Sequence, residues 1–153
     1  MKFKIAPMSQ ADAVAVARWH YPDPYSFYDW TADNEDAALL LDAERRKGRF
    51  FSVQDEKGKL VGFFELQKLG NDVVIGLGLH PELTGRGLGG DFLEAGIAFA
   101  QRKFRPARFR LSVATFNKRA IKVYERAGFT TTRSFDHETN GGVYRFLEMT
   151  RPA

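Results

Sequence analysis

The 153-residue chain contains no cysteine, which excludes a disulfide framework and a cysteine nucleophile. It also lacks an apolar run long enough to span a bilayer. Its first seven residues alternate apolar and charged side chains and do not form the apolar stretch of a signal peptide. With three histidines, none at ligand spacing, no metal is expected. We therefore expect a cytoplasmic protein without a membrane partner.

A surplus of acidic charge is absent as well. The net charge is +4, and the arginines are concentrated between residues 102 and 133. A basic chain can bind nucleic acid, but no segment resembles a recognition helix, so no nucleic-acid partner is expected. These arginines fit solvated helix faces that help to attract an anionic cofactor. The length predicts one domain over residues 1–153.

Apolar periodicity and turn residues predict strands and helices in the order β-α-α-β-β-β-α-β-α-β-β. The predicted strands cover residues 2–6, 50–55, 60–68, 73–79, 108–114, 129–136 and 143–150, and the predicted helices cover 9–19, 33–47, 87–104 and 117–127. The hairpins require antiparallel pairing, and the central strand–helix–strand crossover requires parallel pairing. The predicted fold class is α+β, a mixed, largely antiparallel sheet flanked by helices.

A glycine-rich turn, Thr84-Gly85-Arg86-Gly87-Leu88-Gly89-Gly90, separates the predicted strand 73–79 from a predicted helix. Glycines allow the backbone to approach a ligand closely. The free amides and positive dipole end of the helix favour a phosphate or pyrophosphate. The spacing is not that of a dinucleotide-binding Rossmann turn, and the Gly-Lys-Ser/Thr ending of a Walker A loop is missing. The turn therefore predicts a pyrophosphate-bearing ligand of another class.

A second motif follows the glycine turn. Asn117 stands at a strand-to-helix junction, and Tyr124 lies two helical turns further on the same side. Together, the glycine turn and the pattern Asn-x-x-Ala-x-x-x-Tyr-x-x-x-Gly-Phe over residues 117–129 closely resemble the GNAT superfamily of N-acetyltransferases. The predicted element order matches that fold along essentially the whole chain, and the motifs match over residues 73–129.

This resemblance implies acetyl-CoA as the cofactor. Backbone amides of the glycine turn would hold the coenzyme A pyrophosphate, and the predicted strand ending at Leu79 would run along the pantetheine arm. The amide of Leu77 would donate to the thioester carbonyl and stabilise the oxyanion. Asn117 would bond the pantetheine arm, and Tyr124 would protonate the leaving thiolate as general acid. The implied cofactor-binding residues are Leu77, Leu79, Thr84, Gly85, Arg86, Gly87, Leu88, Gly89, Gly90, Asn117 and Tyr124.

The sequence departs from the family pattern at two positions. Thr84 stands where the family signature has Arg or Gln, so we expect weaker cofactor binding. Val73 stands where many members carry a glutamate that acts as the base. Glu65 on the preceding strand is the candidate catalytic base that accompanies Tyr124. The alternatives are His80, Glu82 and a water relay, and Asp72 would point to the opposite face of its strand.

Residues 19–30 are rich in aromatic side chains. They would either seal one side of the core or, because the corresponding region of the family borders the acceptor site, contact the acceptor. The aromatic rings and the nearby carboxylates (Asp23, Asp29, Asp33 and Glu35) suit a cationic amine. Tyr25, Tyr28 and Asp29 are the expected substrate residues.

The predicted function is direct transfer of an acetyl group from acetyl-CoA to a primary amine, of a small molecule or of a peptide or protein, through a tetrahedral intermediate. A different acyl group remains an alternative, since the glycine turn recognises phosphates. A non-catalytic acyl-CoA-binding module is a second alternative. The exposed edge of the last predicted hairpin leaves a monomer or a homodimer open.

Overall fold

The structure is a computed structural model that describes residues 1–153. The chain divides into two compact units. The first contains residues 1–65 and 77–84, and the second contains residues 66–76 and 85–153. Strands β3 and β4 each contribute one end to each unit. That residues 1–153 form one domain stays a prediction, and the two units are described separately below.

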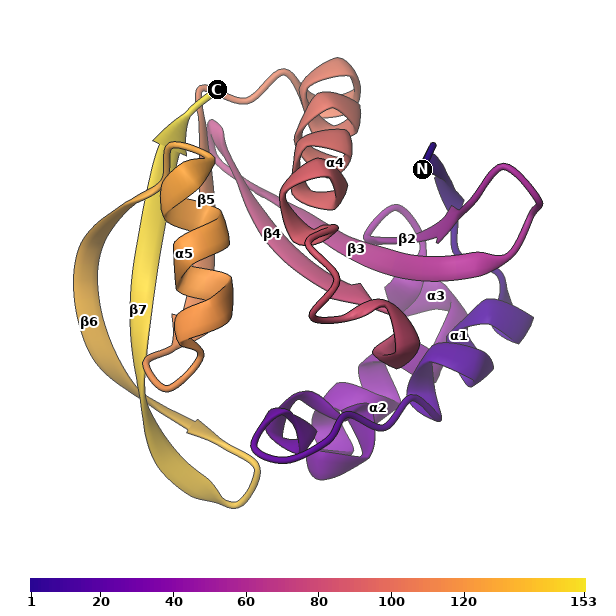
Figure 1. Ribbon diagram of the computed structural model, residues 1–153, viewed down its shortest axis with the longest axis horizontal. Helices are drawn as coiled ribbons and strands as arrows, with labels where there is room; N and C mark the ends of the chain where they lie inside the picture. Colours follow the sequence, from indigo (N-terminus) through magenta and orange to yellow (C-terminus); the bar gives the residue numbers. More distant parts are fainter. The chain divides into compact units, whose positions relative to one another are not determined.

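Seven strands form one sheet in the order β1-β2-β3-β4-β5-β7-β6 (Figure 1). The pairings of β1 with β2, β2 with β3, β5 with β7 and β6 with β7 are antiparallel, and that of β4 with β5 is parallel, so the predicted α+β class is confirmed. The elements are β1 (Lys4–Pro7), α1 (Gln10–Ala17), α2 (Asn34–Leu41), α3 (Ala43–Arg46), β2 (Phe50–Gln54), β3 (Leu60–Leu69), β4 (Asp72–Leu79), α4 (Gly89–Phe104), β5 (Arg108–Ala114), α5 (Lys118–Arg126), β6 (Thr130–Thr139) and β7 (Gly142–Pro152).

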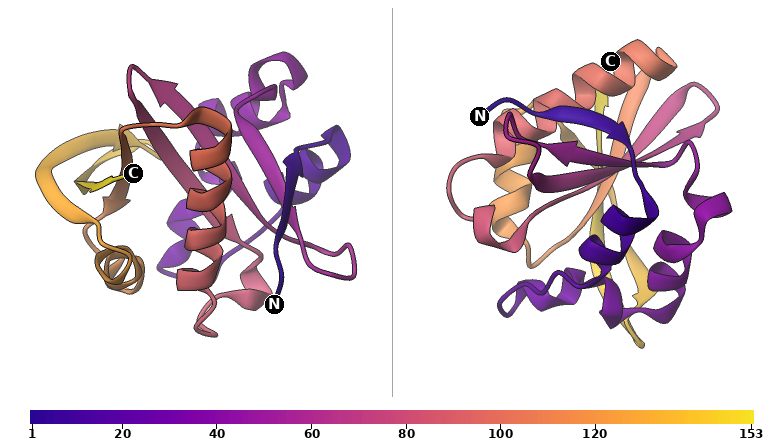
Figure 2. Two further views of the ribbon diagram at one scale, coloured as in Figure 1. Left: turned by 90° about the horizontal axis from the view of Figure 1, so that it is seen from above. Right: turned by 90° about the vertical axis from the view of Figure 1, so that its right-hand side faces the viewer.

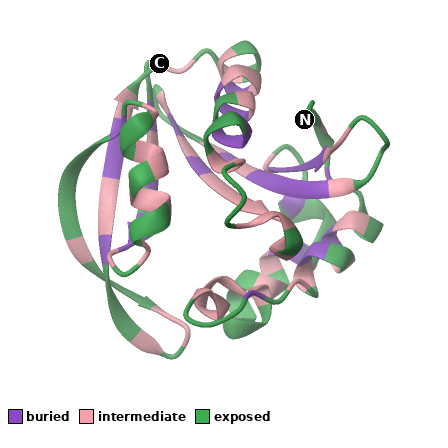
Figure 3. Ribbon diagram, viewed as in Figure 1, coloured by how far each residue is buried: buried purple, intermediate pink, exposed green.

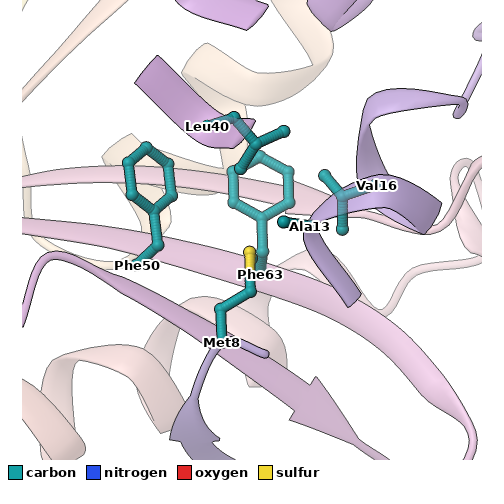
Figure 4. Close-up of a cluster of buried hydrophobic side chains, with 6 residues drawn as sticks. All are labelled: Met8, Ala13, Val16, Leu40, Phe50 and Phe63. Carbon is teal, nitrogen blue, oxygen red and sulfur yellow. The ribbon is translucent and has the colours of Figure 1, made fainter. Parts of the chain in front are cut away.

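The core of the first unit lies between β2, β3 and the helices α1 and α2. Figure 4 shows the buried cluster of Met8, Ala13, Val16, Leu40, Phe50 and Phe63. The Trp30 ring packs edge-on against Phe50, with centroids 5.8 Å apart, and lies 5.6 Å from the Phe63 ring. The Ser9 hydroxyl caps α1 by accepting a hydrogen bond from the Asp12 amide at 3.1 Å, as its position predicts.

The predicted second helix, residues 33–47, is wrong as a single element. It divides into α2 and α3 at Asp42, whose backbone is extended (φ −87°, ψ 111°). The Asp42 carboxylate accepts hydrogen bonds from the amides of Glu44 and Arg45 at 3.0 and 3.2 Å. This local cap competes with continuation of the helix. Before α2, the aromatic segment forms two short 3-10 helices, η1 (Tyr25–Tyr28) and η2 (Trp30–Ala32).

The second unit contains the parallel pairing and two neighbouring helices. β4 pairs with β5 from Asp72↔Arg108 to Val74↔Arg110, and β5 has its predicted bounds. Helices α4 and α5 lie beside each other in both views of Figure 2. A Cβ added to Gly89 would lie 3.3 Å from Cγ2 of Val123. A glycine at this position therefore allows the two helices to approach closely.

Strand β6 is the edge strand of the second unit. Its residues are exposed along almost the whole strand (Figure 3), while the apolar residues Phe146 and Met149 of β7 are buried. The hairpin turn contains Asn140 (φ 52°) and Gly141 (φ 74°), which is the geometry of a two-residue turn. The pairing continues to Thr139↔Gly142, so β6 is longer than predicted.

Candidate functional site

In the second unit, the glycine turn leads directly into α4. Gly85 and Gly87 have φ values of 73° and 76°, which glycine adopts without strain. The predicted helix start at Gly87 is therefore wrong, and α4 begins at Gly89. Leu88, at the N-cap position, provides no side-chain hydrogen bond to the helix. The first amides of α4 thus have no side-chain cap, which is the arrangement that binds anions at helix N-termini.

Arg119 lies beside this turn. A Cβ added to Gly85 would be 3.4 Å from Nη1 of Arg119, so the guanidinium borders the backbone expected to hold pyrophosphate. The sequence interpretation placed the arginines on solvated faces and missed this one. The only feature of the sequence that could have indicated this role is the position of Arg119 in the first turn of α5, two residues after Asn117. Arg86, which the family resemblance placed among the cofactor-binding residues, is exposed.

Asn117 directly precedes α5, and Tyr124 lies about two helical turns further along the helix. The side-chain oxygen of Asn117 accepts a hydrogen bond from the Ala120 amide at 3.2 Å, so Asn117 is the N-cap of the helix. The Tyr124 ring is half-buried and lies edge-on to Phe129, with centroids 6.2 Å apart. Gly128, with φ 92°, follows the end of the helix as predicted. The catalytic and cofactor roles of Asn117 and Tyr124 stay predictions.

The first unit contains the C-terminal end of β4, where Leu77 and Leu79 were expected to contact the pantetheine arm. The Tyr21 hydroxyl donates a hydrogen bond of 2.7 Å to the Leu79 carbonyl oxygen. The His80 amide donates to the Val61 carbonyl at 2.8 Å. A Cβ added to Gly78 would lie 2.4 Å from Cε1 of Phe63. Two aromatic residues, Tyr21 and Phe63, therefore contact the end of β4.

Thr84 uses its hydroxyl within the first unit. The Thr84 Oγ1 donates a hydrogen bond of 2.8 Å to the Pro81 carbonyl oxygen. A hydroxyl has a single proton to donate, and a phosphate oxygen requires a donor. The expected bond from Thr84 to phosphate would thus need this local hydrogen bond to break.

The candidate bases are partly engaged. The Glu65 carboxylate accepts a hydrogen bond from Arg49 Nε at 2.5 Å, so one of its oxygens is occupied. In the second unit, Val73 is fully buried. The neighbouring Asp72 pairs with Arg108 at 2.9 Å and Arg110 at 3.1 Å. The hydrogen bond from Arg108 is the main cause that lowers the pKa of Asp72 below its usual range, which makes that carboxylate a weaker base.

His80 caps a short turn. Its Nδ1 accepts a hydrogen bond from the Glu82 amide at 3.1 Å, which places the proton of the neutral imidazole on Nε2. The Nε2 atom is then a donor and cannot accept a proton in this tautomer. The His80 ring also lies edge-on to Trp19, with centroids 5.1 Å apart. This geometry favours a structural role for His80.

The expected substrate residues occupy the aromatic segment of the first unit. Tyr25 and Tyr28 are half-buried in η1. Asp29 is 8% exposed in its side chain, and both of its oxygens are engaged. Oδ2 lies 2.5 Å from His20 Nδ1, and Oδ1 accepts a hydrogen bond from the Tyr21 amide at 2.9 Å. Asp29 therefore stabilises the loop, and a direct contact with an acceptor stays a prediction.

The other carboxylates of this region also make local bonds. Asp23 accepts a hydrogen bond from the Ser26 hydroxyl, and Asp33 caps α2 by accepting from the Glu35 and Asp36 amides at 3.0 and 3.1 Å. Burial, followed by the charge of Asp29, raises the pKa of Tyr21 above its usual range, so Tyr21 remains a neutral hydrogen-bond donor. Sequence reasoning missed Tyr21, because its partner Leu79 is distant in the chain.

No group of three or more His, Cys, Asp or Glu residues is arranged to hold a metal ion. None of the helices combines the length and the apolar composition that a bilayer crossing requires.

Curated relatives are similar to this chain in sequence. The mycothiol acetyltransferase of Streptomyces coelicolor is 32% identical over 131 residues, which cover 82% of this chain and 38% of that protein. The mycothiol acetyltransferase of Propionibacterium freudenreichii is 37% identical over 83 residues, which cover 51% of this chain and 26% of that protein. The chain thus spans well under half the length of either relative.

Solved structures share the fold. A spermidine N-acetyltransferase from Vibrio cholerae in complex with CoA and spermine has a TM-score of 0.79 at 17% identity, covering 98% of this chain and 95% of that chain. A GNAT-family acetyltransferase from Bacillus anthracis has a TM-score of 0.76 at 15% identity. The match covers 99% of this chain and 95% of that chain. A family model described as an acetyltransferase (GNAT) domain matches residues 2–130. Since this match includes most of the chain, the protein belongs to the GNAT family of acetyltransferases, which use acetyl-CoA as the acyl donor.

Proposed function

We propose that the chain transfers the acetyl group of acetyl-CoA directly to a primary amine. The observation that carries the proposal is the turn before α4. Gly85 and Gly87 have positive φ values, the helix has no side-chain cap, and Arg119 lies beside Gly85. Backbone amides, a helix dipole and a guanidinium together favour a pyrophosphate. Family membership supports the assignment of that pyrophosphate to coenzyme A.

The remaining proposed contacts are those with the pantetheine arm and the thioester of acetyl-CoA. Leu77 and Leu79 would bond the pantetheine arm as a neighbouring strand does, and the Leu77 amide would donate to the thioester carbonyl. Such a donor stabilises the negative charge that develops on the oxygen of a tetrahedral intermediate. Asn117 would bond the same arm through its side-chain amide while its oxygen caps α5. The Tyr124 hydroxyl would protonate the leaving thiolate.

The acceptor is proposed as an amine of a small molecule or of a peptide. The curated relatives are mycothiol acetyltransferases, and a structural neighbour binds spermine. Asp23, Asp29 and Asp33 make local bonds but keep their negative charge, and the aromatic rings would add cation–π attraction to it. A monomer and a homodimer both remain compatible with the proposal.

The test is release of coenzyme A from acetyl-CoA with spermine, a neutral monoamine and a peptide amino terminus as acceptors. The chain has no cysteine, so a thiol reagent reports only the released coenzyme A. Turnover with an amine is expected, and Tyr124→Phe is expected to lower kcat by about 100-fold, as for loss of a general acid. Tyr144→Phe, a matched change at a 38% exposed tyrosine of β7, is expected to keep wild-type kcat.

The same assay separates the alternatives. Acetyl-CoA binding without turnover on any amine would contradict the enzyme and favour the acyl-CoA-binding module. Faster turnover with a longer acyl-CoA would instead assign the chain a different acyl group. Equal kcat for Tyr124→Phe and the wild type would remove Tyr124 from the mechanism.

A further inference from the structure

We propose that His20 is the general base of the transfer reaction and that Asp29 is its positioning residue. This inference rests on the proposed function, because it assigns the proton acceptor that Val73 cannot provide. All the contacts that carry it lie within the first unit. None of the family motifs includes either residue.

The hydrogen bond between the two side chains sets the tautomer of the imidazole. His20 Nδ1 lies 2.5 Å from Asp29 Oδ2. A carboxylate only accepts hydrogen bonds, so Nδ1 carries the proton and Nε2 of the neutral ring has a free lone pair. The Asp29 side chain is 8% exposed, whereas that of His20 is 77% exposed. A buried carboxylate thus orients an imidazole that is largely exposed to solvent, from which an acceptor amine arrives.

The position of Asp29 is itself fixed from both sides. Its Oδ1 accepts a hydrogen bond from the Tyr21 amide at 2.9 Å. Its backbone amide donates to the Ser26 carbonyl, and its carbonyl accepts from the Ala32 amide, each at 3.0 Å. These bonds join η1 to η2 and hold the carboxylate in one orientation. Because Asp29 is fixed in this way, the imidazole of His20 that it orients already has a defined position when it takes a proton.

The residues on both sides of His20 contact the end of β4. The Tyr21 hydroxyl donates to the Leu79 carbonyl at 2.7 Å, and the Trp19 ring lies 5.1 Å from the His80 ring. Leu77 to Leu79 is the segment proposed to run along the pantetheine arm. His20 therefore belongs to a loop that is bonded to the cofactor-binding strand.

The other candidate bases lack this arrangement. His80 Nδ1 accepts a hydrogen bond from Glu82, so its Nε2 carries the proton. The Glu65 carboxylate is bonded to Arg49. His137 lies on the β6–β7 hairpin with its ring 5.0 Å from that of Phe146. Among these groups, His20 is the one whose hydrogen bond leaves a nitrogen lone pair for a proton.

The chemical step balances without a further reagent. His20 Nε2 takes one proton from the amine nitrogen, and the lone pair of that nitrogen forms the bond to the acetyl carbon. The carbon–sulfur bond breaks, and its electron pair leaves with the sulfur of coenzyme A, which is then protonated. The products are the amide and coenzyme A, and the proton held by the imidazolium returns through water to Tyr124, the proposed donor of the proton on the sulfur.

The experiment is the pH dependence of kcat/KM for His20→Gln, with an aromatic amine as acceptor. Such an amine is neutral across the assay range, so a change with pH reports a group of the enzyme. The titratable group bonded to His20 is Asp29. The next ones are carried by the chain neighbours of His20: the Tyr21 phenol, which bonds Leu79, and the His80 ring, which Trp19 contacts. In the wild type, kcat/KM should rise with pH, because a general base acts only in its unprotonated form.

In His20→Gln this rise should disappear, and kcat should fall by about 100-fold or more, as for loss of a general base. Added imidazole should restore part of the activity of His20→Ala, which a structural role would not produce. Asp29→Asn should lower kcat while acetyl-CoA still binds, because an amide can favour the wrong tautomer. His137→Gln, a matched change at an exposed histidine, should keep the wild-type profile.

The outcomes separate the two proposals. Absence of wild-type turnover on every amine, the aromatic amine and those of the earlier assay alike, contradicts the proposed function and this inference together. Wild-type turnover with an unchanged pH profile in His20→Gln contradicts the inference alone. Failure of imidazole to restore activity to a His20→Ala variant that still binds acetyl-CoA also contradicts it.

Discussion

The hydroxyl of Tyr21 donates a hydrogen bond of 2.7 Å to the carbonyl oxygen of Leu79, which is 58 positions further along the chain. Tyr21 is 9% exposed, so water does not readily replace this bond. The contact joins the loop that carries His20 to the strand proposed to bind the pantetheine arm. It therefore links the proposed acceptor side of the first unit to its proposed cofactor side.

Tyr21→Phe removes this hydrogen bond and leaves the ring in place. The free energy of unfolding should fall by about 1 kcal/mol, and KM for acetyl-CoA should rise more than kcat falls, because the end of β4 loses a fixed position. Steady-state kinetics and urea unfolding measure the two effects. Tyr144→Phe is the control, and an unchanged KM in Tyr21→Phe would show that the bond does not position the strand.

The same phenol predicts how stability changes at high pH. Burial and then Asp29 raise the pKa of Tyr21 above its ordinary value of 10.0, so the unfolded state loses its proton first. The stabilisation is complete below about pH 10 and declines as the pH rises towards the folded pKa, with a slope of at most about 1.4 kcal/mol per pH unit. Urea unfolding between about pH 9 and pH 12 should show a weaker decline in Tyr21→Phe than in the wild type. Parallel curves would contradict this.

Gly78→Ala tests the close approach of Phe63 to β4. The new Cβ would lie 2.4 Å from Cε1 of the ring, so one of the two must move, at a cost of about 1–3 kcal/mol. Phe63→Leu removes the contacting atoms. The double variant should be less destabilised than the sum of the single variants by about 1 kcal/mol. Additive effects in urea unfolding would show that the contact is not the cause.

Arg46→Met tests a buried arginine that joins α3 to α1 and α2. Arg46 is 4% exposed, and it donates hydrogen bonds of 2.7 Å to the Leu40 carbonyl and to the Gln10 side chain. Its loss should cost about 1–3 kcal/mol, because the buried Leu40 carbonyl loses its donor and the part-buried bond to Gln10 is lost as well. Arg45→Met, at the exposed neighbouring position, should change stability by less than about 0.5 kcal/mol. Similar values for the two variants would contradict the account.

Much of the fold was predictable because it depends on local signals. The bounds of β5 agree with the prediction, and Asn117 and Gly128 flank α5 as predicted. The division of α2 from α3 was not predictable from periodicity, since it depends on the carboxylate of Asp42 bonding the Glu44 and Arg45 amides. Turn and cap chemistry thus decided the boundaries that periodicity alone placed wrongly.

The candidate site was predictable only where it consists of backbone. The glycine turn follows from its residues, but the partners of the side chains come from distant segments. The bond from Arg49 to Glu65 and that from Tyr21 to Leu79 leave no pattern in the sequence. The bond from Thr84 to Pro81 is local, yet it depends on a short turn that only the structure reveals.

The most direct test of the central claim is calorimetric titration of acetyl-CoA into the wild type, Gly87→Glu and Gly58→Glu. Gly87 and Gly58 have φ values of 76° and 80°, and a Cβ at either meets nothing within 4 Å, so the two substitutions share the same strain and charge. The account predicts that the wild type and Gly58→Glu bind and that Gly87→Glu loses at least about 100-fold in affinity, or about 2.7 kcal/mol. Absence of binding by the wild type, or equal affinity in the two variants, would contradict it.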